Sequence, residues 1–157
     1  MNEEGVMEVK NVYRLLGIGI VSGGVLSIFF KWIEQATGHK VYTLLLNVDY
    51  IPVFRNYTYP EPVEVIFHLI VSIVLVFILQ FIIEKKNIKQ IMGFCALANL
   101  LIGVLIYPTT VLSTRTPPID SMAAIVYWLI GHIVYGLLLG ILLTRIRWKR
   151  TAVHREL

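Results

Sequence analysis

Four uninterrupted apolar runs constrain the fold of this chain more than any other feature of its sequence. Their approximate bounds are residues 12–33, 63–83, 88–107 and 122–144. A helix crosses a hydrocarbon core of about 30 Å with roughly 20 apolar residues, so each run is long enough to span. Inside lipid every backbone N–H and C=O group needs a partner, which favours helices, and the runs are too long and too continuously apolar for barrel strands. The sequence predicts an all-α, polytopic membrane protein with four transmembrane helices in an up-down bundle.

The composition excludes a separate soluble domain. Of the 157 residues, 57% are hydrophobic and only 15% are charged, and the mean hydropathy is +0.73. That is too little polar surface to cover a water-soluble globule of this size, so residues 1–157 are expected to form one transmembrane domain. Cys95 is the single cysteine, which excludes an intrachain disulfide.

The basic residues lie at the ends of the apolar runs and set the expected orientation. Ten of the fourteen Lys and Arg residues belong to the two termini and the second connection. Such a bias predicts that both termini and the turn over 84–89 are cytoplasmic. The ten are Lys10, Arg14, Lys85, Lys86, Lys89, Arg145, Arg147, Lys149, Arg150 and Arg155. The expected outer connections are a long loop over 35–62 and a Pro-rich loop over 109–121.

The net charge of +4 does not indicate nucleic-acid binding, because no aromatic-plus-basic recognition pattern accompanies it. The basic cytoplasmic tail over 145–157 is expected to contact anionic lipid headgroups. Tryptophan residues near the ends of the runs are typical of the interfacial aromatic belt. They are Trp32, Trp128 and Trp148.

Small residues recur every four positions on two of the predicted helices. Gly19 and Gly23 lie on the first, and Gly136 and Gly140 lie on the fourth. Such ridges let helix backbones approach closely in lipid. They predict tight packing inside the bundle or between protomers of a homo-oligomer, and a pore lining or ligand groove is the alternative.

Polar residues inside the apolar runs are the candidate functional residues. His132 precedes Gly136 by one helical turn, so it is expected to face the bundle interior, about 15 Å along its helix and near the bilayer midplane. Ionisable groups at this depth are costly and commonly functional. The other polar residues expected in the interior are Glu64, His68 and Ser72, one turn apart, and Asn99, one turn before Gly103.

Three interpretations of the two histidines stay open at the level of sequence. Each can act as hydrogen-bonding glue between helices, as a proton-responsive group, or as a ligand of a metal or haem. Neither the ligand spacing of a metal site nor a cofactor fingerprint is present, so no metal or cofactor is expected. Lys31 and Glu34 close the first helix near the start of the second, either as snorkelling interfacial charges or as flanks of an outer entrance to a polar cleft.

Several short motifs resemble, in order, those of the YagU-like family of small bacterial inner-membrane proteins. They are the segment 17–24 leading to Lys31-Trp32, the segments 67–70 and 107–108, Thr116-Pro117-Pro118, and the segment 131–136. The resemblance implies a multi-pass plasma-membrane protein associated with survival at acid pH, without a defined reaction. His68 and His132 match its helix-borne histidines. Two departures are the shorter outer connection and Gly103, which stands in place of a polar residue.

These observations predict a non-enzymatic plasma-membrane protein linked to acid or envelope stress, in which His68 and His132 sense or pass protons. The sequence contains no nucleophile elbow and no phosphate-cradling glycine loop, so an enzyme is not expected. The alternatives are a small ion or solute transporter and a scaffold that binds partner proteins.

Overall fold

The computed structural model describes residues 3–49, 51, 53–54, 57 and 59–153, with side chains described in that set from residue 11 to residue 146. Within these ranges every regular element is a helix and there is no strand. Four helical segments are long and apolar enough to cross a membrane, namely 11–37, 61–85, 91–112 and 122–146. The expected all-α architecture with four membrane-length helices is therefore confirmed, and it is typical of a multi-pass membrane protein.

The first helix, α1, spans Glu3–Thr37 and is longer at both ends than the apolar run. Charged residues before the run continue the helix, because a helix that leaves lipid can be solvated by water while it keeps its internal hydrogen bonds. The helix ends at Gly38, whose φ of 76° is readily adopted only by a residue without a side chain. The Gly38 N–H donates to the Glu34 carbonyl at 2.8 Å and closes the last turn.

The connection after α1 contains a short helix, and the second membrane helix follows it. The short helix α2 spans Val41–Leu46, inside the segment that was expected to be a loop over 35–62. Helix α3 spans Glu61–Lys85 with Pro62 in its first turn, where the missing N–H of proline costs no helical hydrogen bond.

The last two membrane helices also extend beyond their apolar runs. Helix α4 spans Ile91–Ile106 and continues as the 3₁₀ helix η1, Tyr107–Leu112, so the beginning of the expected Pro-rich loop is helical. Helix α5 spans Met122–Val153 and includes most of the expected basic tail over 145–157. The tail residues are good helix formers, which explains the continuation.

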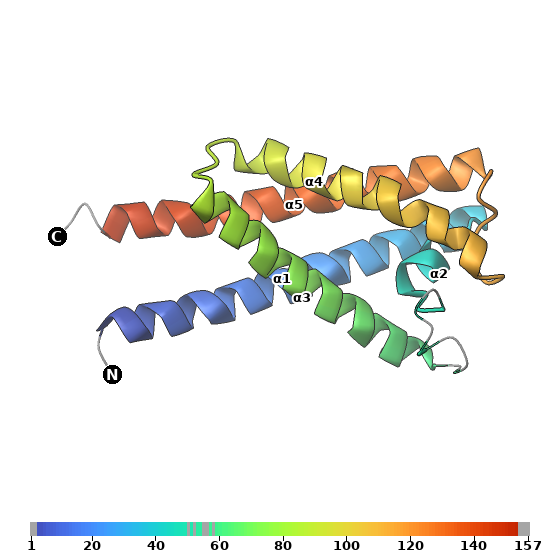
Figure 1. Cartoon of the computed structure of the whole chain (residues 1–157), viewed down its shortest axis with the longest axis horizontal. Coiled ribbons are helices and arrows are strands. Elements are labelled where there is room, and N and C mark those ends of the chain that lie inside the picture. Colours follow the sequence, from blue (N-terminus) through green and yellow to red (C-terminus); the bar gives the residue numbers. More distant parts are fainter. Residues whose placement is uncertain (1–2, 50, 52, 55–56, 58, 154–157) are drawn as a thin grey trace.

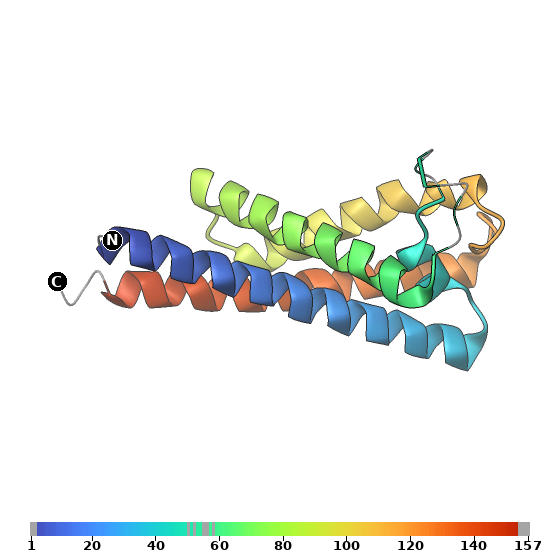
Figure 2. The same cartoon turned by 90° about the horizontal axis from the view of Figure 1, so that it is seen from below.

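The helices run up and down, as Figure 1 shows, and both chain ends lie at the same end of the bundle as the α3–α4 turn. We call this the termini end, and the opposite end, where α2 lies, the α2 end. Two antiparallel pairs, α1 with α3 and α4 with α5, meet along α1 and α5. Figure 2 shows α1 beside α5 along much of their length. Helix α3 crosses α1 obliquely and diverges from α4 toward the α2 end (Figure 1).

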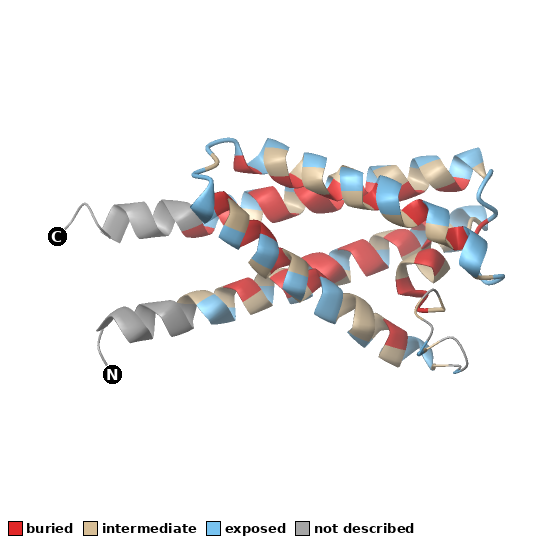
Figure 3. Cartoon of the chain, viewed as in Figure 1, coloured by how far each residue is buried: buried red, intermediate tan, exposed pale blue. Residues whose placement is uncertain are grey.

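Burial follows the inner faces of the helices, and the outer faces are apolar and exposed (Figure 3). Phe30 of α1 stacks on Trp128 of α5 with ring centroids 5.3 Å apart, and both side chains are fully or almost fully buried. Trp128 therefore belongs to the core and not to the interfacial belt in which it was expected. Large aliphatic side chains are exposed on all four membrane helices, among them Ile28, Val74, Leu101 and Ile130. In water this surface would be unfavourable, and lipid covers it at no such cost.

Candidate functional site

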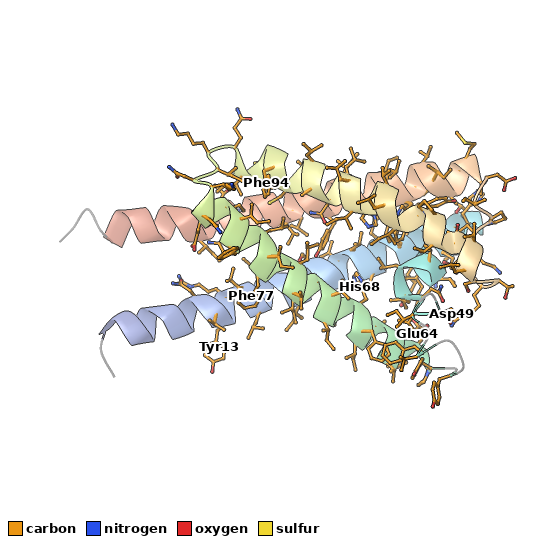
Figure 4. The ribbon with its side chains drawn as sticks, in the orientation of Figure 1. Tyr13, Asp49, Glu64, His68, Phe77 and Phe94 are labelled. Carbon is orange, nitrogen blue, oxygen red and sulfur yellow. The ribbon has the colours of Figure 1, made fainter. Side chains whose placement is uncertain are left out.

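The polar row on α3 packs against the glycine row on α1. The Ser72 hydroxyl donates to the Gly19 carbonyl at 2.8 Å, and His68 Nε2 donates to the Gly23 carbonyl at 3.3 Å. A Cβ atom on Gly23 would lie 2.9 Å from the Ser72 Oγ, so only glycine allows this approach. Ser72 is buried and His68 is half-buried, and Figure 4 shows His68 in the half of α3 that is nearer the α2 end.

His132 lies deep between α4 and α5, with 5% of its surface exposed. Its Nδ1 donates to the Trp128 carbonyl one turn earlier at 2.9 Å, and its ring centroid lies 4.3 Å from that of Trp128. Gly103 of α4 makes room for the imidazole, because a Cβ atom there would lie 2.9 Å from the His132 Cγ. The Trp128 indole N–H donates to the Gly103 carbonyl at 2.9 Å. Gly103 therefore both leaves space for the His132 ring and accepts a hydrogen bond from the adjacent Trp128 ring.

Both histidines line one cavity of about 240 Å³. Its wall is contributed by α1, α2, α3, α4, α5 and the segment after α2, and most of the lining side chains are aliphatic or aromatic. The polar residues in the wall are His68, Ser72, Asn99, His132, Tyr135 and Asn47. The structure therefore brings together His68, His132, Ser72 and Asn99, which were predicted from sequence, and adds Tyr135 and Asn47.

Hydrogen bonding divides these polar groups into satisfied and unsatisfied ones. Ser72 uses its proton toward Gly19, so the Tyr135 hydroxyl donates to the Ser72 Oγ at 2.7 Å, and both hydroxyl protons are engaged. Asn99 donates to the Cys95 carbonyl, but its buried Oδ1 has no partner among the described residues. In the same described set, the buried Nδ2 of Asn47 also lacks an acceptor.

Each imidazole has one nitrogen that is occupied by a backbone carbonyl. A carbonyl oxygen only accepts, so the bonded nitrogen, Nε2 of His68 and Nδ1 of His132, carries the proton in the neutral ring. The other ring nitrogen then carries a lone pair, and it has no hydrogen-bond partner among the residues that the structure describes. The cavity wall thus contains two imidazole acceptors that are free among the described residues, one on His68 and one on His132.

The charged residues near the α2 end form separate pairs. Lys31 contacts Glu61 at 2.6 Å, and Glu34 accepts hydrogen bonds at 2.8 Å from both the backbone N–H and the hydroxyl of Thr43. Glu64 is buried and accepts from Arg115 Nη2 at 2.8 Å. Lys31, Glu34 and Glu64 do line one surface pocket of about 300 Å³, but none is paired with another of the three in the described part of the chain.

Arg115 joins three segments that are distant in the sequence. It reaches Glu64 of α3 from the loop before α5, and its Nη1 lies 3.8 Å from Asp49 in the segment after α2. Ser113 also donates to Asp49 at 2.7 Å. Figure 4 shows Asp49 and Glu64 at the same end of the molecule. These contacts hold the Pro-rich loop and the segment after α2 over the α2 end of the bundle.

Tyr42 of α2 adds a second hydrogen bond to Glu61, which Lys31 already contacts. The Tyr42 hydroxyl donates to the same carboxylate oxygen at 2.8 Å. Partial burial, together with this hydrogen bond to a carboxylate, raises the pKa of Tyr42 above its ordinary value.

The glycine ridges face other helices of the same chain. A Cβ atom on Gly19 would lie 2.7 Å from the Ile73 backbone of α3. On α5, a Cβ atom on Gly136 would lie 2.6 Å from the Cys95 carbonyl oxygen, and one on Gly140 would lie 2.6 Å from the Met92 Cα. These surfaces are used within the bundle, at the α1–α3 and α4–α5 contacts.

No group of three or more His, Cys, Asp or Glu side chains is arranged to hold a metal ion in the described ranges. Two predicted features extend beyond the described residues: Arg155 lies outside them, and the side chains of the basic tail are described only as far as residue 146. Comparison with protein-family models, with curated proteins and with solved structures finds no match for this chain.

Proposed function

We propose that this chain is a non-enzymatic multi-pass protein of a bacterial plasma membrane that responds to acid through His68 and His132. The observation that carries this proposal is that both imidazoles line the same intramembrane cavity, each with one ring nitrogen unpartnered among the described residues. The resemblance to the YagU-like family, with its association with survival at acid pH, supports the same conclusion.

The chemistry of the response follows from the tautomers. An unpartnered ring nitrogen is the site at which a neutral imidazole takes up a proton, and histidine does so near pH 6.5 when unperturbed, about where a modest fall in pH changes its charge. Protonation of both rings would place two positive charges, on α3 and α5, in one mostly apolar cavity. Their repulsion and their demand for water favour a wider, hydrated cavity, and this change of shape is the proposed signal.

In the proposed orientation both termini are cytoplasmic and the α2 end faces outward. Ten of the fourteen Lys and Arg residues belong to the termini and the α3–α4 turn, which supports it. The cavity then lies beneath the outward-facing loops, in reach of external protons, and the basic tail contacts anionic headgroups of the inner leaflet.

Acid survival of cells that carry the His68→Gln/His132→Gln double variant tests this function. We expect the double variant to lose acid protection while its abundance in the membrane stays at the wild-type level. His39→Gln is the matched control, because it removes a histidine at the α2 end that does not line the cavity. Unchanged survival of the double variant, or an equal loss with His39→Gln, would reject the proposal.

A second candidate is the transport of an ion or small solute, because the cavity extends from α2 to the middle of the bundle. Toward the termini end the next turns are closed by buried apolar side chains, namely Val76, Leu79, Leu139 and Leu143. Conduction would require these side chains to separate. Vesicles that contain the protein and a pH dye discriminate the candidates, since a proton path dissipates an imposed gradient and a sensor does not.

A scaffold that docks partner proteins is the third candidate. The glycine ridges that suggested it are occupied by α3 and α4, so a partner or a second protomer would have to use the exposed apolar outer faces. Copurification in mild detergent tests this candidate, and a partner retained in the His68→Gln/His132→Gln variant would favour it over the sensor.

A further inference from the structure

The cavity that contains the two histidines also has the features of a binding site for a small molecule. The wall of the cavity holds two imidazole nitrogens without a partner among the described residues, one on His68 and one on His132, and His132 is only 5% exposed. A buried polar atom without a partner costs about 1–3 kcal/mol, so a molecule that satisfies these atoms gains affinity from doing so. Proteins seldom leave two such atoms around one cavity unless water or a ligand completes them.

The free groups define the hydrogen-bonding character of the occupant. The unpartnered ring nitrogens of His68 and His132 both accept a hydrogen bond. A hydroxyl group fits them, because it can donate to an imidazole acceptor. A molecule with acceptors alone, such as an ether, would leave both nitrogens unsatisfied.

The wall of the cavity indicates an uncharged occupant. No Asp, Glu, Lys or Arg side chain is among the described residues that line it. An ion in a mostly apolar cavity at this depth would lack a counter-charge, which costs several kcal/mol. The aromatic rings of Trp128, Phe67 and Tyr135 in the wall favour a partner with a flat, apolar body.

The volume limits the occupant to about one ring. An engineered apolar cavity of about 150 Å³ is large enough to hold benzene. The present cavity measures about 240 Å³, which leaves room for one substituted ring and is small for a larger ligand.

The route of access is through the membrane. Ile70 and Val71 of α3 line the cavity and are also 52% and 60% exposed on the outer surface of the bundle. The α3 wall of the cavity therefore also belongs to the apolar surface that lipid covers. A molecule dissolved in the bilayer can reach the cavity without crossing the polar loops at the α2 end.

We propose that the cavity between α3, α4 and α5 binds a small, uncharged, membrane-soluble molecule with one ring and at least one hydroxyl group. The hydroxyl group donates to the unpartnered ring nitrogen of His132 or of His68, and the ring lies among the aromatic and aliphatic wall residues. This binding does not depend on the proposed acid response, because the acceptors are free when both imidazoles are neutral.

The test uses two matched probes, para-fluorophenol and para-fluoroanisole, which differ in that a methyl ether replaces the hydroxyl donor. Their binding to the purified full-length protein in phosphatidylcholine nanodiscs is followed by fluorine NMR at mildly alkaline pH, with empty nanodiscs to correct for partition into lipid. We expect saturable binding of the phenol, with an affinity about tenfold higher than that of the anisole. This factor corresponds to the net contribution of one hydrogen bond to a buried acceptor.

Two variants locate the site. His132→Phe keeps the side-chain volume similar and removes the more deeply buried of the two acceptors, so it should lower the preference for the phenol several-fold and leave anisole binding unchanged. Gln80→Leu is the matched control, because it removes a buried polar side chain from α3 that does not line the cavity. If His132→Phe does not fold, His68→Phe provides the same comparison.

Two results would overturn the proposal. Absence of saturable binding by the phenol would mean that the cavity holds only water. Equal affinity for the two probes, or a preference that survives both His132→Phe and His68→Phe, would mean that the hydrogen-bonding groups do not select the occupant. Neither result bears on acid survival, so a failure here is distinguishable from a failure of the proposed function.

Discussion

Helices α4 and α5 approach each other closely at Gly136, and substitution of this glycine by alanine tests the packing of the bundle. The new Cβ atom would lie 2.6 Å from the Cys95 carbonyl oxygen and 2.7 Å from the Ala96 Cα. Both atoms belong to the backbone of α4, so no side chain can rotate away to relieve the clash. The two helices must separate by several tenths of an ångström over at least one turn.

The expected magnitude is the balance of two terms. Replacing glycine by alanine inside a helix contributes about 0.5–1 kcal/mol of stability through helix propensity. Inserting a methyl group into a packed interface costs typically about 1–3 kcal/mol. We therefore expect Gly136→Ala to lower the free energy of unfolding of the bundle by a net value of about 1–2 kcal/mol.

Gly24→Ala is the matched control, because a Cβ atom at Gly24 would meet nothing within 4 Å. This variant retains the propensity gain without a clash and should be neutral or stabilised by about 0.5–1 kcal/mol. The two substitutions are chemically identical, so their opposite signs isolate the effect of helix packing.

The assay is the rate at which Cys95 is alkylated in mild detergent. Cys95 is the single cysteine of the chain and is fully buried at the α4–α5 contact, so a reagent reaches it only when this contact opens. A destabilisation of about 1.4 kcal/mol raises the open population, and with it the alkylation rate, about tenfold. Alkylation of Gly136→Ala at the same rate as wild type or Gly24→Ala would refute the packing described for α4 and α5.

Two further predictions concern the α2 end. Replacing Arg115 with methionine leaves the buried Glu64 carboxylate without its cation and should lower the stability measured by thermal unfolding by about 1–2 kcal/mol. Lys31→Met breaks an exposed ion pair and should lower it by only about 0–1 kcal/mol. Equal effects of the two variants would contradict the difference in burial between Glu64 and Glu61. Because its pKa is raised, Tyr42 is still protonated at pH 10.0, the ordinary tyrosine pKa, so its hydrogen bond to Glu61 persists there and is lost only at higher pH. A Tyr42→Phe variant should therefore show the same tyrosinate absorbance as the wild type up to pH 10.0. A lower absorbance of the variant in this range would contradict the raised pKa.

The membrane-length helices were predictable from sequence because continuous apolar length suffices to identify a span. The inward orientation of His132 was also accessible, since its one-turn spacing from Gly136 places both on the face that packs against α4. The helix ends were less accessible, because charged residues such as those before residue 11 continue a helix beyond the apolar run. Hydropathy marks only the part of a helix that is buried in lipid.

The contacts between distant segments could not be predicted from one sequence. The pairing of Arg115 with Glu64 and Asp49 depends on how two loops fold over the bundle, and no local spacing encodes it. Trp128 was expected in the interfacial belt, but it lies six residues after the start of α5, deep enough to be buried. There its ring stacks on Phe30 and its indole N–H donates to the Gly103 carbonyl. The cavity itself is lined by side chains of five helices and of the segment after α2, so it is a tertiary feature.

The proposed response to acid requires that the two cavity imidazoles exchange protons with the surrounding water. Nitrogen NMR of histidine-labelled protein in liposomes measures this directly, with His68→Gln and His132→Gln used to assign the signals. We predict that both imidazoles change from the neutral to the protonated form, reversibly, as the pH outside the α2 end falls. Imidazoles that stay neutral down to the pH at which the bundle unfolds would contradict the account.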